Sequence, residues 1–104
     1  MNTSQAQHYN YLYEQHLINL SLQGKRPATI DAYSRAVRRI TEYFDQTPDT
    51  LTTAHLKQYF NSLIQTHSWS TVKIDRNGLQ FFYRYTLNKQ WEWLAIVKPP
   101  QVKR

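Results

Sequence analysis

The sequence predicts an all-α fold, in which four helices are followed by a C-terminal aromatic tail. Its 104 residues are enough for one domain with a modest core. Only two glycines occur, so the breaks in the chain suit short loops between helices better than turns between strands. Apolar residues also recur at steps of three and four, which is the spacing of one helix face.

The first two helices are expected over residues 4–23 and 27–45. Gly24 supplies the left-handed stop after the first helix, and Pro27 suits the first turn of the second. The core face of the second helix consists of residues that alternate steps of three and four: Ile30, Tyr33, Val37, Ile40 and Phe44. Its opposite face carries Arg35, Arg38, Arg39 and Glu42.

The third helix is expected to begin at Thr52 or Thr53, whose hydroxyl can cap its first turn, and to end near Gln65. The fourth is expected to begin near Ser68 or Ser70 and to continue to about residue 88. The tail at 90–104 then carries two tryptophans before a Pro-Pro break.

The fourth helix divides into two faces on a helical wheel. With Val72 as the reference point of the wheel, the arc predicted to be buried contains Ile74, Gly78, Leu79, Phe81, Phe82, Tyr85 and Thr86. The opposite ridge contains Lys73, Arg76, Asn77, Gln80 and Arg84, with no acidic residue. Lysine and arginine contact phosphates, and amides and arginine can read base edges, so the ridge is a candidate DNA-binding surface.

Ser70 and Thr71, at the start of this helix, can add hydroxyl contacts to a phosphate. The alternative is that Ser70 only caps the helix and the ridge is an ordinary solvated face.

The second helix offers a similar set of residues near its start, namely Lys25, Arg26, Thr29 and Arg35. The chain has 13 basic and 7 acidic residues, a net charge of +6, which favours a polyanionic partner and nucleic acid first among polyanions. Asp31 and Glu42 can pair with arginines on their own helix, so its N-terminal half is the better candidate for contact.

Other chemistry finds little support in the sequence. The absence of cysteine excludes disulfides and thiol catalysis, and the four histidines lack the spacing of metal ligands, so neither a metal nor a cofactor is expected. His8 and His16 are expected to be exposed or half-buried. Neither a long apolar run nor a signal peptide is present, which predicts a soluble cytoplasmic chain without a membrane partner.

The order of these signals resembles the N-terminal core-binding domain of the tyrosine recombinase or phage integrase family, especially its Xer-like and integron-like members. The resemblance is carried by residues 25–33 with Phe44 downstream, by residues 70–86, and by residues 98–104, which are similar to the basic linker before the catalytic domain. It implies a four-helix orthogonal SAM-like bundle over residues 1–97, with the linker to a missing catalytic domain beginning at 98. One departure is Arg26, where the family often has a hydroxyl.

This resemblance implies that the second and fourth helices clamp double-stranded DNA for DNA integration and recombination. It also implies contact with other recombinase subunits in the full-length protein, whereas the fragment alone is expected to be monomeric. The family's catalytic arginines, lysine and nucleophilic tyrosine lie in the separate C-terminal domain, so no residue of this chain is expected to be catalytic. The alternative from a different class is a small helical protein-interaction module.

Overall fold

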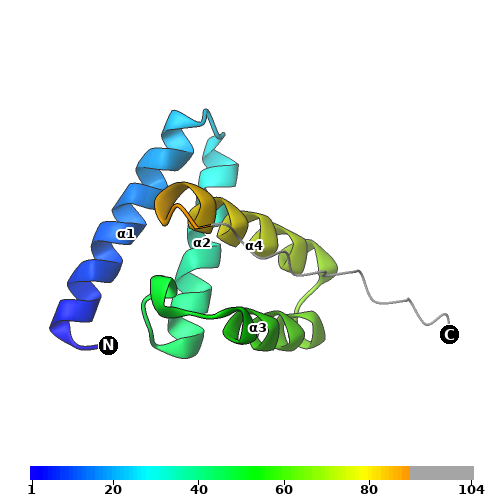
Figure 1. Cartoon of the computed structure of the whole chain (residues 1–104). Coiled ribbons are helices and arrows are strands. Elements are labelled where there is room, and N and C mark those ends of the chain that lie inside the picture. The colour runs from blue at the N-terminus through cyan, green and yellow to red at the C-terminus, as the bar shows by residue number, and fades with distance from the viewer. Residues whose placement is uncertain (90–104) are drawn as a thin grey trace, which may run out of the picture.

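The computed structural model describes residues 1–89 and confirms the all-α, four-helix prediction (Figure 1). The helices are α1 (Thr3–Leu22), α2 (Pro27–Phe44), α3 (Thr53–Thr66) and α4 (Trp69–Phe81). A 3-10 turn, η1 (Pro48–Thr50), precedes α3, and a π-helical turn, η2 (Phe82–Thr86), continues α4; neither turn is predicted from the residue pattern. The predictions for the tail at 90–104, including the linker at 98–104, lie outside the described residues.

Local signals set the helix ends. Gly24 has a φ of +69°, and the N–H of Lys25 donates to the carbonyl of Leu20 at 3.1 Å, which closes α1 in a Schellman motif. The side chain of Thr52 caps α3 and that of Ser68 caps α4. Because Ser68 is the cap, the hydroxyl of Ser70 is left for another role.

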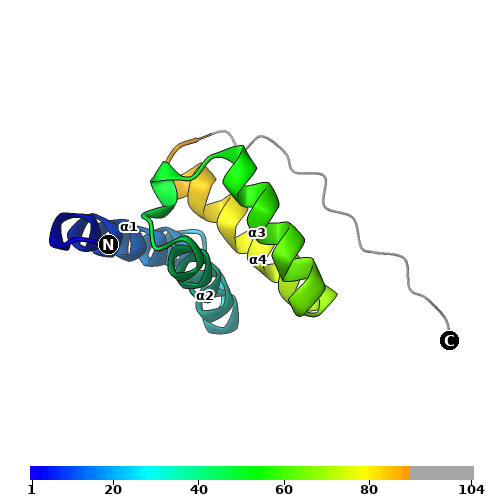
Figure 2. The same ribbon diagram turned by 90° about the horizontal axis from the view of Figure 1, so that it is seen from below.

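The core lies where α2 crosses α4, and the other two helices cover the sides of this crossing. Figure 2 shows α3 lying along α4 and α1 beside α2. The side chains buried at the centre come from all four helices and from η2: Leu20, Val37, Ile40, Tyr59, Phe60, Val72, Leu79 and Phe82. The two helices predicted to carry the functional residues are therefore held together by the core itself.

Gly78 allows α2 and α4 to approach closely at their crossing. A Cβ atom added at this position would lie 3.0 Å from the Cα of Tyr33 and 3.1 Å from the Cβ of Ala36. Both contacts are with atoms of the α2 backbone or directly attached to it, so they cannot be relieved by a side-chain rotation. The spacing between the two helices therefore depends on this glycine.

A Gly78→Ala variant is expected to lower the free energy of unfolding by about 1–2 kcal/mol, because the clash with α2 outweighs the better helix propensity of alanine. Urea denaturation of the two proteins measures this loss. Adding Ala36→Gly should recover part of it, since one of the two close contacts is removed. A Gly78→Ala variant as stable as the original would contradict the close-approach explanation.

The prediction that Ile74 and Tyr85 are buried is wrong, because Ile74 is 40% exposed and Tyr85 is 38% exposed. Ile74 lies in the N-terminal half of α4, whereas α1 packs against η2 at the other end. Tyr85 lies in the π-helical turn, where hydrogen bonds span five residues and a wheel drawn at 100° per residue no longer applies. Tyr83 is buried there instead, and its hydroxyl donates to the carbonyl of Pro48 at 2.6 Å.

The expectation for His8 is confirmed, since it is exposed, but that for His16 is wrong, since its side chain is completely buried. Its Nε2 lies 3.2 Å from the carbonyl oxygen of Tyr33, and its ring meets the rings of Phe81 and Phe82 edge-on at centroid distances of 5.9 and 5.2 Å. Burial lowers the pKa of His16 to about 4. His16 therefore joins α1 to α2 and α4 as a neutral core residue.

Candidate nucleic-acid interface

An open groove of about 300 Å³ lies where the start of α2 faces the C-terminal half of α4. It is lined by Lys25, Tyr33, Asn77, Gln80, Phe81, Arg84 and Tyr85. Four of these residues, Lys25, Asn77, Gln80 and Arg84, were predicted from sequence to be site residues. The fold thus brings part of both predicted surfaces into one depression.

The cations of this groove rest on aromatic rings. The Nζ of Lys25 lies 5.8 Å from the ring centre of Phe81, and the guanidinium carbon of Arg84 lies 5.4 Å from that of Tyr85. No carboxylate among residues 1–89 forms an ion pair with either cation. Their charge is therefore available to an anionic ligand, and the amides of Asn77 and Gln80 line the same groove.

A second, smaller depression of about 100 Å³ lies between α2 and the N-terminal half of α4. It is lined by Ala32, Arg35, Arg39, Thr71, Ile74 and Asp75. Arg35 forms an exposed ion pair with Asp31, one turn earlier, at 2.5 Å. The hydroxyl of Thr71 lies 3.2 Å from that of Ser68. Both predicted residues here, Arg35 and Thr71, therefore already have partners within the domain.

The remaining predicted residues differ in exposure. Ser70 and Lys73 are exposed on α4, and Arg26 is exposed just before α2, with Thr29 half-buried in its first turn. Arg76 is half-buried and its Nε is enclosed, so this side chain lies partly against the domain. The ridge of α4 is therefore less uniformly exposed than the wheel predicted, and the structure places its C-terminal half in the larger groove.

Sequence reasoning missed a buried polar cluster that joins α2, α3 and α4. The carboxylate of Asp75, which is 3% exposed, accepts from Arg39 at 2.6 Å and from the hydroxyl of Tyr59 at 3.2 Å. Burial raises the pKa of Asp75, an effect that the nearby Arg39 guanidinium opposes. Asp75 falls inside the apolar arc of the fourth helix, and an acid at such a position signals a buried partner.

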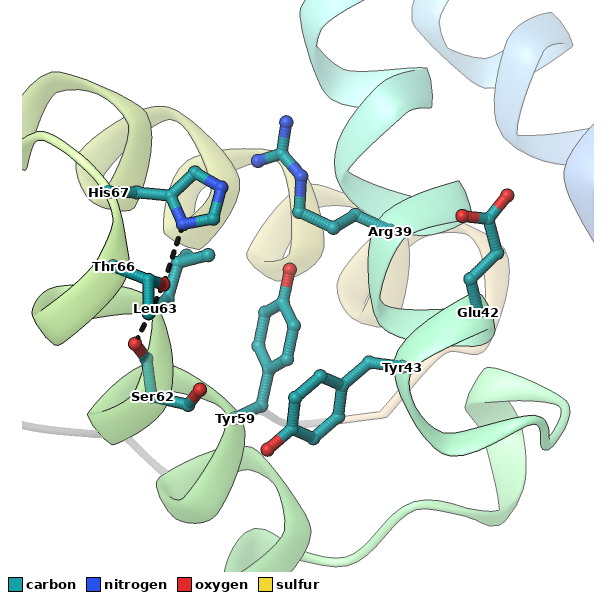
Figure 3. A pocket seen from close by; sticks show the side chains of 8 residues that line it. All are labelled: Arg39, Glu42, Tyr43, Tyr59, Ser62, Leu63, Thr66 and His67. Atoms are coloured by element: carbon teal, nitrogen blue, oxygen red, sulfur yellow. Dashed lines mark hydrogen bonds between the residues drawn. The ribbon is translucent and has the colours of Figure 1, made fainter.

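This cluster forms one wall of a third pocket, of about 340 Å³, between α2 and α3. Figure 3 shows Arg39, Tyr43 and Tyr59 around it, and the Thr66 hydroxyl, which donates to the carbonyl of Ser62 and contacts the ring of His67. Because Arg39 is held by Asp75, its guanidinium supports the fold and is not an open cationic site.

The described part of the chain contains no group of three or more histidine, cysteine, aspartate or glutamate side chains placed to hold a metal ion. Over the same residues, no helix has the length and apolar character needed to span a bilayer.

Comparison with known proteins gives a match to a family. The model of the family described as "Phage integrase, N-terminal SAM-like domain" matches residues 12–93. This span begins within α1 and includes all of α2, α3 and α4, and therefore both grooves on α4. No curated protein and no solved structure matches the chain.

Proposed function

The chain belongs to the phage integrase N-terminal SAM-like domain family, and we propose that it is the DNA-binding module of a site-specific tyrosine recombinase. In this proposal α2 and α4 clamp duplex DNA during DNA integration and recombination. The chain itself is not an enzyme, because the chemistry of strand cleavage belongs to a catalytic domain elsewhere in the parent recombinase. An Xer-like or integron-integrase-like parent is the member of the family that we favour, from the resemblance of residues 70–86.

The observation that carries this proposal is the meeting of α2 and α4 at one groove that is lined by cations and amides. Lys25 lies just before α2 and Arg84 in η2, and Asn77 and Gln80 of α4 line the same groove. Cations supply the phosphate contacts that hold a protein on DNA, and amides supply paired donors and acceptors for base edges. Arg26, Thr29, Ser70 and Lys73 extend the surface at the starts of the two helices.

The outer side of α1 supports the part of the proposal that concerns other recombinase subunits. Tyr11, Ile18 and Leu22 follow each other on one stripe and are 58%, 46% and 76% exposed. An apolar stripe of this kind suits a protein partner. We propose that the isolated chain is monomeric, that this stripe meets another subunit only on DNA, and that the protein works in the cytoplasm, where its DNA is.

Electrophoretic titration with duplexes of mixed sequence at low salt tests DNA binding. Lys25→Ala and Arg84→Ala are each expected to weaken binding by several-fold and to reduce the slope of log K against log salt by about one, because each removes one phosphate contact. The matched control is Lys57→Ala, which removes an exposed cation of α3 and should change neither quantity. Equal effects of the three variants would contradict the proposed surface.

Amide chemical-shift mapping separates this proposal from the alternative, a small helical protein-interaction module. Duplex DNA should shift the amides of residues 25–39 and 70–84. A protein partner should instead shift the amides of residues 4–23 or 91–97, and the absence of any shift on addition of duplex DNA would favour the protein-interaction module.

An Asp31→Asn variant is expected to bind duplex DNA about two- to five-fold more tightly. The change removes a negative charge and releases Arg35 from an ion pair whose side chains are more than half exposed, and such pairs are worth at most about 1 kcal/mol. Titrations at two salt concentrations measure the gain, which should shrink at higher salt. Glu14→Gln, an exposed acid on α1, is the control and should have no effect. Unchanged affinity in Asp31→Asn would indicate that Arg35 does not contact DNA.

A further inference from the structure

Ile74 is an exposed apolar residue among polar and charged residues on α4. It is a β-branched apolar side chain on the N-terminal half of the helix, 40% exposed, beside Lys73 and one turn before Asn77. The domain covers it only partly, because α1 contacts Phe81 and η2 at the far end of α4. The other residues that line the depression beside Ile74 are Ala32, Arg35, Arg39, Thr71 and Asp75. The exposed part of the Ile74 side chain therefore does not contribute to the packing of the domain.

We propose that Ile74 contacts the 5-methyl group of a thymine in the major groove and thereby contributes to sequence specificity. This inference rests on the proposed DNA-binding function. The methyl group of thymine is the apolar group that base pairs present in the major groove, and an aliphatic side chain gains free energy by excluding water from it. The basic and amide side chains around Ile74 suit DNA better than an apolar protein surface.

The geometry of α4 supports this role. Ser70, Ile74 and Asn77 follow at steps of four and three, so they lie along one side of the helix. Ile74 and Asn77 each line a depression that α2 shares. If α4 lies in the major groove with Lys73 and Arg84 towards phosphates, Ile74 and Asn77 approach the base edges together. Asn77 would then read donors and acceptors while Ile74 reads a methyl group at a neighbouring base pair.

The test begins with a random duplex library, from which the original chain selects its best-bound sequences. In the most enriched duplex, each dT is then replaced singly by dU, which removes only the methyl group. One replacement is expected to weaken binding by about four-fold, as the loss of one buried methyl group predicts. Ile74→Ala should bind the unmodified duplex several-fold more weakly and lose nothing further at that dU, because the two changes remove the same contact.

The matched control is Ile64→Ala, which truncates a half-buried isoleucine on α3, away from the proposed DNA-binding surface, and should retain the full dU effect. Thermal unfolding of both variants checks that the domain remains folded. If no dU replacement weakens binding, or if Ile74→Ala keeps the dU effect, the thymine contact is overturned while DNA binding stands. If the chain enriches no duplex at all, the proposed DNA-binding function fails, and this inference fails with it.

Discussion

An Arg39→Met variant is expected to lose about 3 kcal/mol of folding free energy. Methionine retains much of the apolar stem, but it leaves the buried carboxylate of Asp75 without the cation that lies 2.6 Å away. Removing one partner of a buried ion pair typically costs about 3–5 kcal/mol, and the lower end applies here because the Arg39 side chain is 32% exposed. Urea denaturation at neutral pH measures the loss.

The pH dependence of this loss identifies its cause. Burial already raises the pKa of Asp75, and removing Arg39 should raise it further. A carboxyl group whose pKa is raised in the folded state favours folding when protonated, so Arg39→Met should recover stability relative to the original protein as the pH falls from 7 towards the raised pKa.

The matched control is Arg38→Met, which removes an exposed cation from the preceding position of α2. It should lower stability much less and show no such recovery at lower pH. Equal losses in the two variants would mean that the buried pair contributes little.

Acid is expected to destabilise the domain through His16. The folded state holds the pKa of this residue at about 4, whereas an unfolded chain has its ordinary value of 6.5. The unfolded chain therefore binds the extra proton first as the pH falls, and the stability that neutral His16 provides is present above pH 6.5 and is lost on the way to pH 4. The loss amounts to about 3 kcal/mol.

A His16→Gln variant cannot titrate and its amide can still donate to the carbonyl of Tyr33, so it separates this effect from the titration of carboxylates. Its free energy of unfolding should fall by about 3 kcal/mol less between pH 7 and pH 4 than that of the original protein. If His16→Gln follows the same curve as the original protein, His16 is protonated without unfolding.

Local and periodic features of the fold were predictable from the sequence. The left-handed Gly24, the helix beginning at Pro27, and the caps at Thr52 and Ser68 each depend on one residue and its immediate neighbours. The core face of α2 followed from the three- and four-residue spacing of its apolar residues, of which Val37 and Ile40 are completely buried.

The predictions of burial were wrong where burial depends on which part of a helix a neighbouring helix covers. A wheel treats Ile74 and Phe81 as equivalent positions of one apolar side, but α1 covers only the end that contains Phe81. His16 was expected to be at least half exposed, although Leu12, His16 and Leu20 recur at steps of four on the buried side of α1. In the π-helical turn, hydrogen bonds span five residues, so the side chains of Tyr83 and Tyr85 point in other directions than a regular α-helix would give them.

The candidate site shows the same division. Residue types and spacing predicted Lys25 just before α2, Asn77 and Gln80 on α4 and Arg84 in η2 as contact residues, because the side-chain chemistry of phosphate and base contact is local, and their role stays a prediction. Only the tertiary structure decided that these residues line one groove, that Arg39 and Arg35 are paired with Asp75 and Asp31, and that Ile74 is exposed among them. The physical reason is that helix periodicity determines the direction in which a side chain leaves the axis of its helix. The residues from other helices that this side chain meets depend on the crossing of α2 and α4 at Gly78.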